Sequence, residues 1–171
     1  MFYKRGVSPV VATVLLLVLT VAIAGVVFSV VIPFVNDKLG NSKECIDAFD
    51  GIEFPESKFN CYKTSSGQSG ETGFSVKINK EGIYEVKVSL VDSNENSDVF
   101  SIKEGASNQG LRSIGESYGD LLTFPSAGGQ RTYIVSGVYS KAEMSVVSKS
   151  GNICSVSDVV EFEPCYGEVS F

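Results

Sequence analysis

The chain has 171 residues, with 14 Lys or Arg, 20 Asp or Glu and no histidine, so its net charge is −6. Lys4 and Arg5 come first, a long uncharged segment follows, and all 20 acidic residues lie after that segment, against 12 remaining basic residues. The part after the segment is therefore acidic, at about −8, and lacks the basic face that nucleic-acid binding requires. The length of the whole chain predicts one domain, or one domain plus an appendage.

Residues 10–32, VVATVLLLVLTVAIAGVVFSVVI, form the uncharged segment, in which 16 of 23 residues are Val, Leu, Ile or Phe. About 20 apolar residues span a bilayer, and such residues favour insertion by roughly 5–10 kcal/mol in sum. Because Lys4 and Arg5 precede the segment, the positive-inside bias places the N-terminus in the cytoplasm and the rest of the chain outside. We therefore expect a transmembrane helix.

The helix has recognisable start and stop signals. Ser8 and Pro9 suit a cap followed by the first helical position, and Gly40 is a suitable stop. Pro33 falls inside the helix, which predicts a kink near residues 29–33. A helix over 9–39 would be roughly 46 Å long, longer than the ~30 Å hydrocarbon core.

Two other interpretations of this segment stay open. A secretory signal peptide has a small-x-small cleavage site, and residues 22–24 (Ala-Ile-Ala) fit that pattern loosely, although eight largely apolar residues follow. A plain single-pass anchor needs nothing beyond the apolar span.

All four cysteines lie after the apolar segment: Cys45, Cys61, Cys154 and Cys165. In an exported domain they predict two disulfides, for which three pairings exist. The short spacings favour Cys45–Cys61 and Cys154–Cys165, each closing a loop worth roughly 3 kcal/mol. Zinc is disfavoured because the chain has no Cys-x-x-Cys pair and no histidine.

The N-terminal sequence MFYKRGVSPVVATV combines a short basic leader, a glycine and a Val/Leu/Ala-rich helix. Over about the first 35 residues the chain resembles archaeal type IV pilins. The resemblance implies cleavage after Gly6 by a membrane-bound prepilin peptidase on the cytoplasmic side, with recognition of Lys4 and Arg5. Val7 would become the new N-terminus, and the helix would stay in the mature subunit.

Two differences from related families distinguish which kind of pilin the chain resembles. Bacterial type IV pilins have Glu at the fifth mature position, whereas this chain has Val11 there and no acid before Asp37. Archaeal flagellar-filament subunits, the archaellins, have a Gly-Ile-Gly-Thr-like start, whereas residues 8–11 here are Ser-Pro-Val-Val. The archaeal pilin is favoured, and an archaellin-like subunit remains an alternative.

Small side chains along the helix suit close helix–helix approach. They are Ala12, Thr13, Thr20, Ala22, Ala24 and Gly25. Copies that leave the lipid could bury these helices against one another in a filament core, through a heterologous interface that does not close. The predicted partners are the membrane, other copies of the chain, the peptidase and the pilus assembly machinery.

We divide the chain into a leader (1–6), an apolar helix (7–40) and an exported head (41–171). Residues 74–78 and 84–90 alternate as strands do, with a hairpin turn signal at 79–82. Further strand candidates are 45–54, 59–64, 97–103, 119–123, 130–139, 142–149 and 153–163. The predicted fold class is α+β, a long helix followed by an antiparallel β-sandwich of immunoglobulin-like type. An up-and-down barrel is the alternative.

The head offers little chemistry. With no histidine, no phosphate loop and no Gly-x-Ser-x-Gly, the sequence predicts neither an enzyme nor a cofactor site. Alternating oxygen ligands resemble half a calcium loop, at Asp92, Asn94, Asn96 and Asp98. However, Ser97 stands where that loop needs glycine and Lys103 at its twelfth position, and a solvated polar turn explains the run equally well.

The sequence therefore predicts a structural subunit of a type IV pilus-like filament, used in adhesion or surface attachment. One alternative is a monomeric membrane-anchored ectodomain or a minor pilin-like protein that binds a ligand.

Overall fold

The structure, a computed structural model, describes residues 9–64, 70–148, 150–167 and 169–171, with the side chains of 36–42 and 47 left out. The predicted leader residues Lys4, Arg5 and Gly6, and Val7 after them, lie outside the described residues. The chain divides into two compact units, Met1–Ser42 and Lys43–Phe171, which are described separately.

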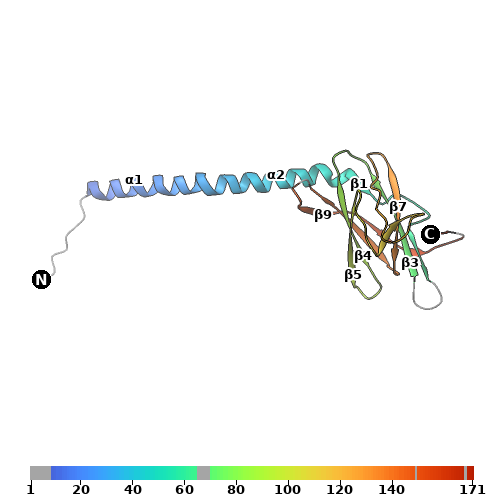
Figure 1. Cartoon of the computed structure of the whole chain (residues 1–171). Coiled ribbons are helices and arrows are strands. Elements are labelled where there is room, and N and C mark those ends of the chain that lie inside the picture. The colour runs from blue at the N-terminus through green and yellow to red at the C-terminus, as the bar shows by residue number, and fades with distance from the viewer. Residues whose placement is uncertain (1–8, 65–69, 149, 168) are drawn as a thin grey trace. The chain divides into compact units, whose positions relative to one another are not determined.

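A helical segment makes up the described part of the first unit, and its last residues belong to the second unit (Figure 1). It consists of α1 (Pro9–Val26), a π-helical turn (Val27–Val31) and α2 (Ile32–Ala48). Near Pro33, where a kink is predicted, the structure has a π-helical turn that ends two residues before the proline. Pro33 has no N–H to give to the carbonyl of Ser29, and its ring would clash with that carbonyl in an α-helix. A π turn just before the proline relieves the crowding.

The expected helix stop at Gly40 is wrong, because α2 runs on to Ala48. Glycine inside a helix costs only about 1 kcal/mol, and the residues after it continue the helix. The strand expected over 45–54 is correspondingly shortened. Residues 45–48 are helical, Phe49–Gly51 form a 3₁₀ turn (η2), and only Ile52–Glu53 pair as a strand, β1.

Two sheets make up the second unit. The first has the order β10-β2-β3-β7-β6 with β1 paired to β3, and the second has the order β5-β4-β8-β9. All pairings are antiparallel except that of β10 with β2. The strand bounds in the first sheet are β2 Cys61–Thr64, β3 Gly70–Ile78, β6 Leu111–Ser113, β7 Gln130–Ser136 and β10 Glu163–Pro164. In the second they are β4 Glu85–Val91, β5 Ser97–Lys103, β8 Lys141–Val147 and β9 Ile153–Glu161.

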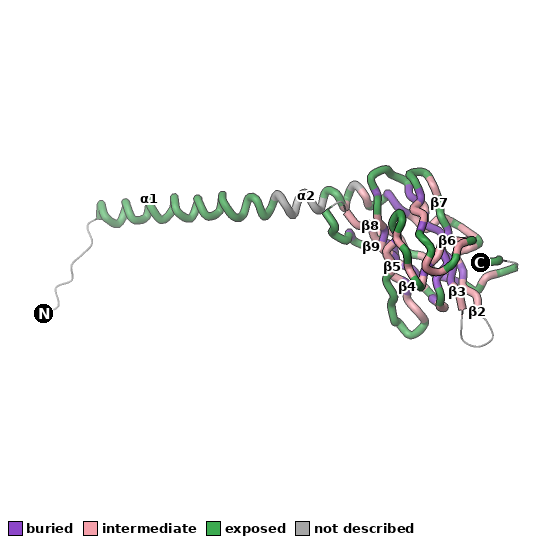
Figure 2. The backbone as a smooth tube through the Cα atoms, in the orientation of Figure 1, coloured by how far each residue is buried: buried purple, intermediate pink, exposed green. Residues whose placement is uncertain are grey.

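One hydrophobic core is shared by the two sheets. Alternate residues along β4 and β8 are buried, and the same cluster includes Phe74 and Val76 of β3 and Tyr133 of β7. The buried positions lie along the strands, whereas α1 is exposed throughout its length (Figure 2). The α+β class is thus confirmed, and the described strands form two mostly antiparallel sheets rather than one closed barrel.

The hairpin expected at residues 79–82 is wrong. The strands on either side, β3 and β4, belong to different sheets, so this turn crosses from one sheet to the other. It is fixed by the amide of Asn79, which donates to the carbonyl of Gly51 at 2.7 Å, and it delivers Ile83 into the core. Residues 119–123 are not a strand either, since only Leu121 forms an isolated bridge, with Ser107.

The two disulfides join distant parts of the sequence. Cys45 bonds Cys154 and Cys61 bonds Cys165, across sequence separations of 109 and 104 residues. The local pairs Cys45–Cys61 and Cys154–Cys165 are therefore wrong. The topology explains the difference, because β10 pairs alongside β2 and brings Cys165 to Cys61, while the last turn of α2 lies against β9.

Candidate functional site in the apolar helix

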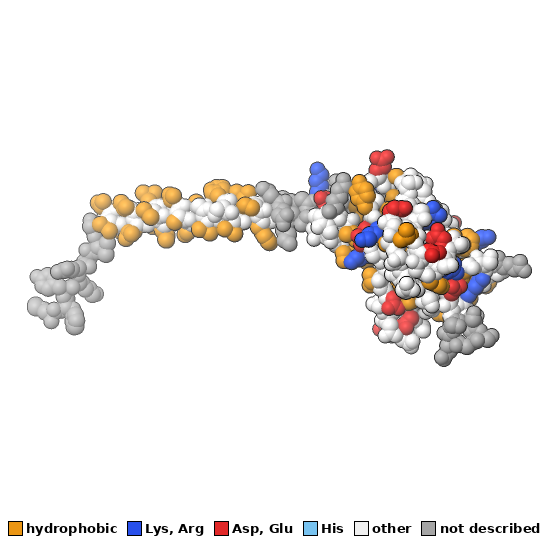
Figure 3. Space-filling model, viewed as in Figure 1, with side chains coloured by type: hydrophobic (Ala, Val, Ile, Leu, Met, Phe, Trp, Pro, Cys, Tyr) orange, Lys and Arg blue, Asp and Glu red, His pale blue; other side chains and the backbone are white. Residues whose placement is uncertain are grey.

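The apolar residues of the helical segment face every direction. Each residue from Pro9 to Val35 is exposed, including Leu17 at 63% and Phe28 at 67%. Figure 3 shows hydrophobic side chains along the whole visible length of α1, without a charged one among them. A surface helix of a soluble protein has a single apolar stripe, whereas a helix that is apolar all round requires an apolar environment on every side.

The few hydroxyl groups on this segment are satisfied within the helix. Thr13 and Thr20 each donate to the carbonyl three residues earlier, at 2.9 Å, and Ser29 does so at 3.2 Å. In hydrocarbon or in a dry protein core, an unsatisfied polar group costs several kcal/mol. The segment can therefore leave water without leaving a hydroxyl unpaired.

The helical segment over Pro9–Val35 is long and apolar enough to cross a membrane, and among the described helices it alone is so. Its 27 residues correspond to about 40 Å at 1.5 Å per residue, against the ~30 Å of a hydrocarbon core. Length and composition alone also fit a signal sequence near the N-terminus.

The small residues singled out in the sequence fall on two sides of the helix. At 3.6 residues per turn, Thr13, Thr20 and Ala24 lie within about 40° of one another. Ala22 and Gly25 lie on the opposite side, and Ala12 lies between the two. A side chain added at Gly25 would meet nothing within 4 Å. Close approach by another helix is thus open from two directions rather than along one seam.

The candidate calcium residues form a polar turn. The carboxylate of Asp92 accepts the amides of Asn94 and Asn96 at 2.8 and 2.9 Å and the side-chain amide of Asn96 at 2.9 Å. The bond from the Asn96 side chain is the main reason that the pKa of Asp92 is lowered. Asp98 lies apart and accepts the hydroxyl of Tyr139 at 2.7 Å. Among the described residues, no group of three or more acidic or cysteine side chains could hold a metal ion.

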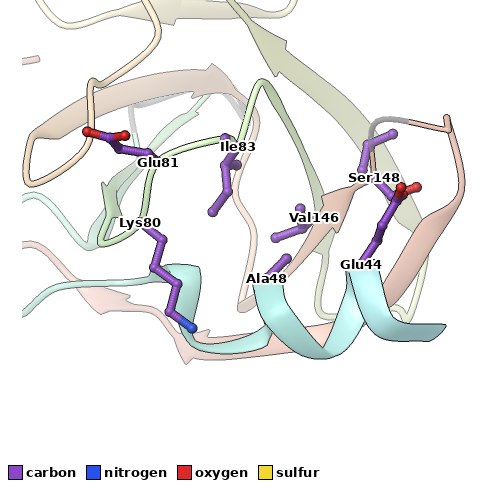
Figure 4. Close-up of a pocket in the computed structure, with 9 residues that line it drawn as sticks. Glu44, Ala48, Lys80, Glu81, Ile83, Val146 and Ser148 are labelled. Carbon is purple, nitrogen blue, oxygen red and sulfur yellow. The ribbon is translucent and has the colours of Figure 1, made fainter. Parts of the chain in front are cut away.

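A cavity of about 290 Å³ opens between the last turn of α2 and the turn that joins β3 to β4 (Figure 4). Ala48, Ile83 and Val146 form its apolar floor, and Glu44 and Lys80 lie at its edge. The described lining also includes Glu81 and Ser148.

A second candidate surface, on the four-stranded sheet, was not predicted from the sequence. The outer face of the four-stranded sheet exposes Val99 at 61%, Ile153 at 57%, Val156 at 41% and Val159 at 44%. The sequence predicts a strand over 153–163, and no role was assigned to either of its faces. The signal for its outer face was present in ICSVSDVV, which has Asp158 as its single charged residue.

The geometry of the chain itself therefore identifies the apolar helix as the principal candidate site. Comparisons with protein-family models, with curated proteins and with solved structures found no match.

Proposed function

We propose that this chain is a structural subunit of an archaeal type IV pilus-like filament, anchored in the membrane by its helix before assembly. The observation that carries the proposal is the described helical segment over Pro9–Val35. It is apolar on all sides and uncharged, and its hydroxyl groups are hydrogen-bonded to carbonyls of the same helix. Such a helix needs lipid around it, or other helices of the same kind.

The head supports export to an oxidising compartment. Two disulfides close it, and disulfides persist in extracellular settings and are rare in the cytosol. A head outside the membrane and a short basic leader inside it agree with the positive-inside orientation.

The strand order supports the immunoglobulin-like interpretation of the head. If β2, β3, β6 and β7 correspond to strands A, B, D and E, the first sheet has the order A-B-E-D. The second sheet then has the order C′-C-F-G, with β4 and β8 as its central strands. Sandwiches of this kind serve many functions, so the fold identifies a stable exported module and not a ligand.

A variant that enlarges a small residue tests filament assembly. Ala24→Leu adds apolar area, so insertion into lipid is kept, while close helix–helix approach on that side is lost. The control Ile23→Leu changes neither size nor polarity. We expect electron microscopy of sheared surface material to show filaments for wild type and control, and few or none for Ala24→Leu, at equal membrane levels.

The same experiment separates the filament from the monomeric membrane anchor. If the chain is only an anchor, wild type yields no filaments. N-terminal sequencing adds a second criterion, because the pilin route gives a chain that begins at Val7. A mature chain that begins after Ala24 would instead identify a secretory signal peptide.

A further inference from the structure

We infer that the outer face of the sheet β5-β4-β8-β9 is the surface through which the head contacts a second copy of this chain. The inference rests on the proposed function, since the helix would bring copies together. It adds a contact made by the heads, which the helix alone does not provide.

The face is a shallow groove with apolar walls. Cross-strand partners lie on the same side of a sheet, and the register places Val99, Ser89, Glu143 and Val159 in one row across the four strands. The next row is Ser101, Lys87, Ser145 and Val156. Short serine side chains in the middle leave a groove of about 200 Å³, with Val99 on one side and Ile153 and Val156 on the other.

A separate hollow lies between the last turn of α2 and β9. Ile46, which is 72% exposed, and Phe49, which is 47% exposed, line this hollow together with Ser155 of β9. Apolar side chains thus extend along β9 and around it. Scattered exposed apolar residues are ordinary, but a contiguous group marks an interaction surface.

The charge balance of this face favours an identical partner. Residues 43–171 contain 11 basic and 19 acidic residues, that is 11 − 19 = −8, so two heads repel each other over most of their surfaces. The outward positions of the four strands instead carry three of each sign: Lys87, Lys103 and Lys141 with Glu85, Glu143 and Glu161. A cationic partner would be drawn to the acidic remainder of the head, whereas a second acidic head is repelled least at this neutral face.

Strand β9 is suited to such a contact because it stands at the end of the sheet order. Sheet edges that must stay free usually carry lysine, arginine or proline. The sequence ICSVSDVVE contains none of these, and the carboxylate of Asp158 is occupied by the amide of Phe54 at 2.7 Å. The exposed surface of β9 therefore offers apolar contact with little to repel a neighbour.

A photo-cross-linking experiment on the full chain in neutral phospholipid vesicles tests the inference. One variant carries p-benzoylphenylalanine in place of Val156, and a matched control carries it in place of Leu121, which is also exposed, at 66%, but belongs to none of the four strands of this sheet. After irradiation, we expect roughly tenfold more dimer on a reducing gel from the Val156 probe than from the Leu121 probe. Because a filament contact joins two different surfaces, mass spectrometry should place the attached residue within residues 43–171 of another copy.

Adding Val159→Lys to the Val156 probe should lower the dimer yield by about tenfold, while adding Leu121→Lys should leave it unchanged. Equal melting temperatures of these variants show that folding is intact. Equal yields from the two probes, no dimer, or attachment outside residues 43–171 of another copy would overturn the inference. Filament imaging tests the proposed function separately. If filaments form without this cross-link, the head contact is refuted and the proposed function stands. If this cross-link forms without filaments, the proposed filament is refuted and the head contact stands.

Discussion

Cys45, in the last turn of α2, is bonded to Cys154, the second residue of β9, with their Cα atoms 5.3 Å apart. The bond attaches the point where the helix enters the head to an edge strand formed 109 residues later. Ser150 reinforces the junction by donating to the carboxylate of Glu44 at 3.1 Å. The head is therefore held at its N-terminal entry by more than the two-residue strand β1.

Loss of this bond should destabilise the head markedly. Replacing both residues with serine, Cys45→Ser with Cys154→Ser, should lower the free energy of unfolding by roughly 2–4 kcal/mol, because the unfolded chain regains a long open loop. Urea unfolding of the full chain in detergent measures this change, with reduced wild type as a reference. Peptide mapping without reduction should recover Cys45 linked to Cys154, and a peptide linking Cys45 to Cys61 would contradict the pairing.

Gly73 on β3 should tolerate no side chain. A Cβ there would lie 2.5 Å from the carbonyl oxygen of Phe59 and 2.7 Å from the ring of Phe171, and the backbone oxygen cannot move aside cheaply. Gly73→Ala should therefore cost about 1–3 kcal/mol of unfolding free energy. In the control Gly110→Ala, the nearest contact is the ring of Phe100 at 3.3 Å, which can yield, so we expect a change within about 0.5 kcal/mol. Thermal melting of both variants compares them, and equal losses would show that the segment over Gly73 does not pack as described.

The raised pKa of Tyr118 predicts that the free energy of unfolding falls at alkaline pH. Burial, and then its 2.7 Å hydrogen bond to Glu71, raise the pKa of Tyr118 from 10.0 to about 12. Since the folded state holds the proton more tightly than the unfolded state, this contribution is complete below pH 10 and is lost as the pH rises toward 12. Burial also raises the pKa of Tyr133 and Tyr139, so the loss continues at higher pH.

The variant Tyr118→Phe isolates this effect. It should flatten the fall of the urea midpoint between pH 10 and 12 relative to wild type, while its stability at pH 7 drops only by the lost contact with Glu71. Absorbance titration of the tyrosines checks the assignment directly. An unchanged slope in the variant would show that Tyr118 does not contribute.

The features that depend on local periodicity, namely the strands and the apolar helix, were predicted well from the sequence. The strand expected over 97–103 coincides with β5, and those expected over 130–139, 142–149 and 153–163 overlap β7, β8 and β9. Alternation of apolar residues is a local property, and along β4 it coincides with the alternation of buried residues. The apolar helix was equally clear, because its composition differs from everything that follows.

The pairing of strands and cysteines that lie far apart in the chain could not be predicted from local sequence patterns. The turn at 79–82 has hairpin chemistry, yet β3 prefers β7 and β4 prefers β8, and no residue in the turn encodes that choice. Cysteine spacing failed for the same reason, since loop-closure entropy favours near neighbours while the folded topology decides which thiols meet. At the calcium candidates, the carboxylate of Asp92 accepts the amides of Asn94 and Asn96, an arrangement that residue spacing alone does not predict.

The apolar helix should be sensitive to one charge at its centre. Leu17 is 63% exposed in the middle of α1, and arginine at the centre of a membrane helix costs about 2.5–3.5 kcal/mol of insertion free energy. Leu17→Arg should therefore raise the share of the chain in the alkaline-extracted fraction above the wild-type value, whereas the control Leu17→Ile should match wild type. The two disulfides report on the destination of the chain, since a head that never leaves the cytosol should remain reduced. If Leu17→Arg pellets like wild type and its cysteines are oxidised, the helix does not span the bilayer as proposed, and export must depend on another segment.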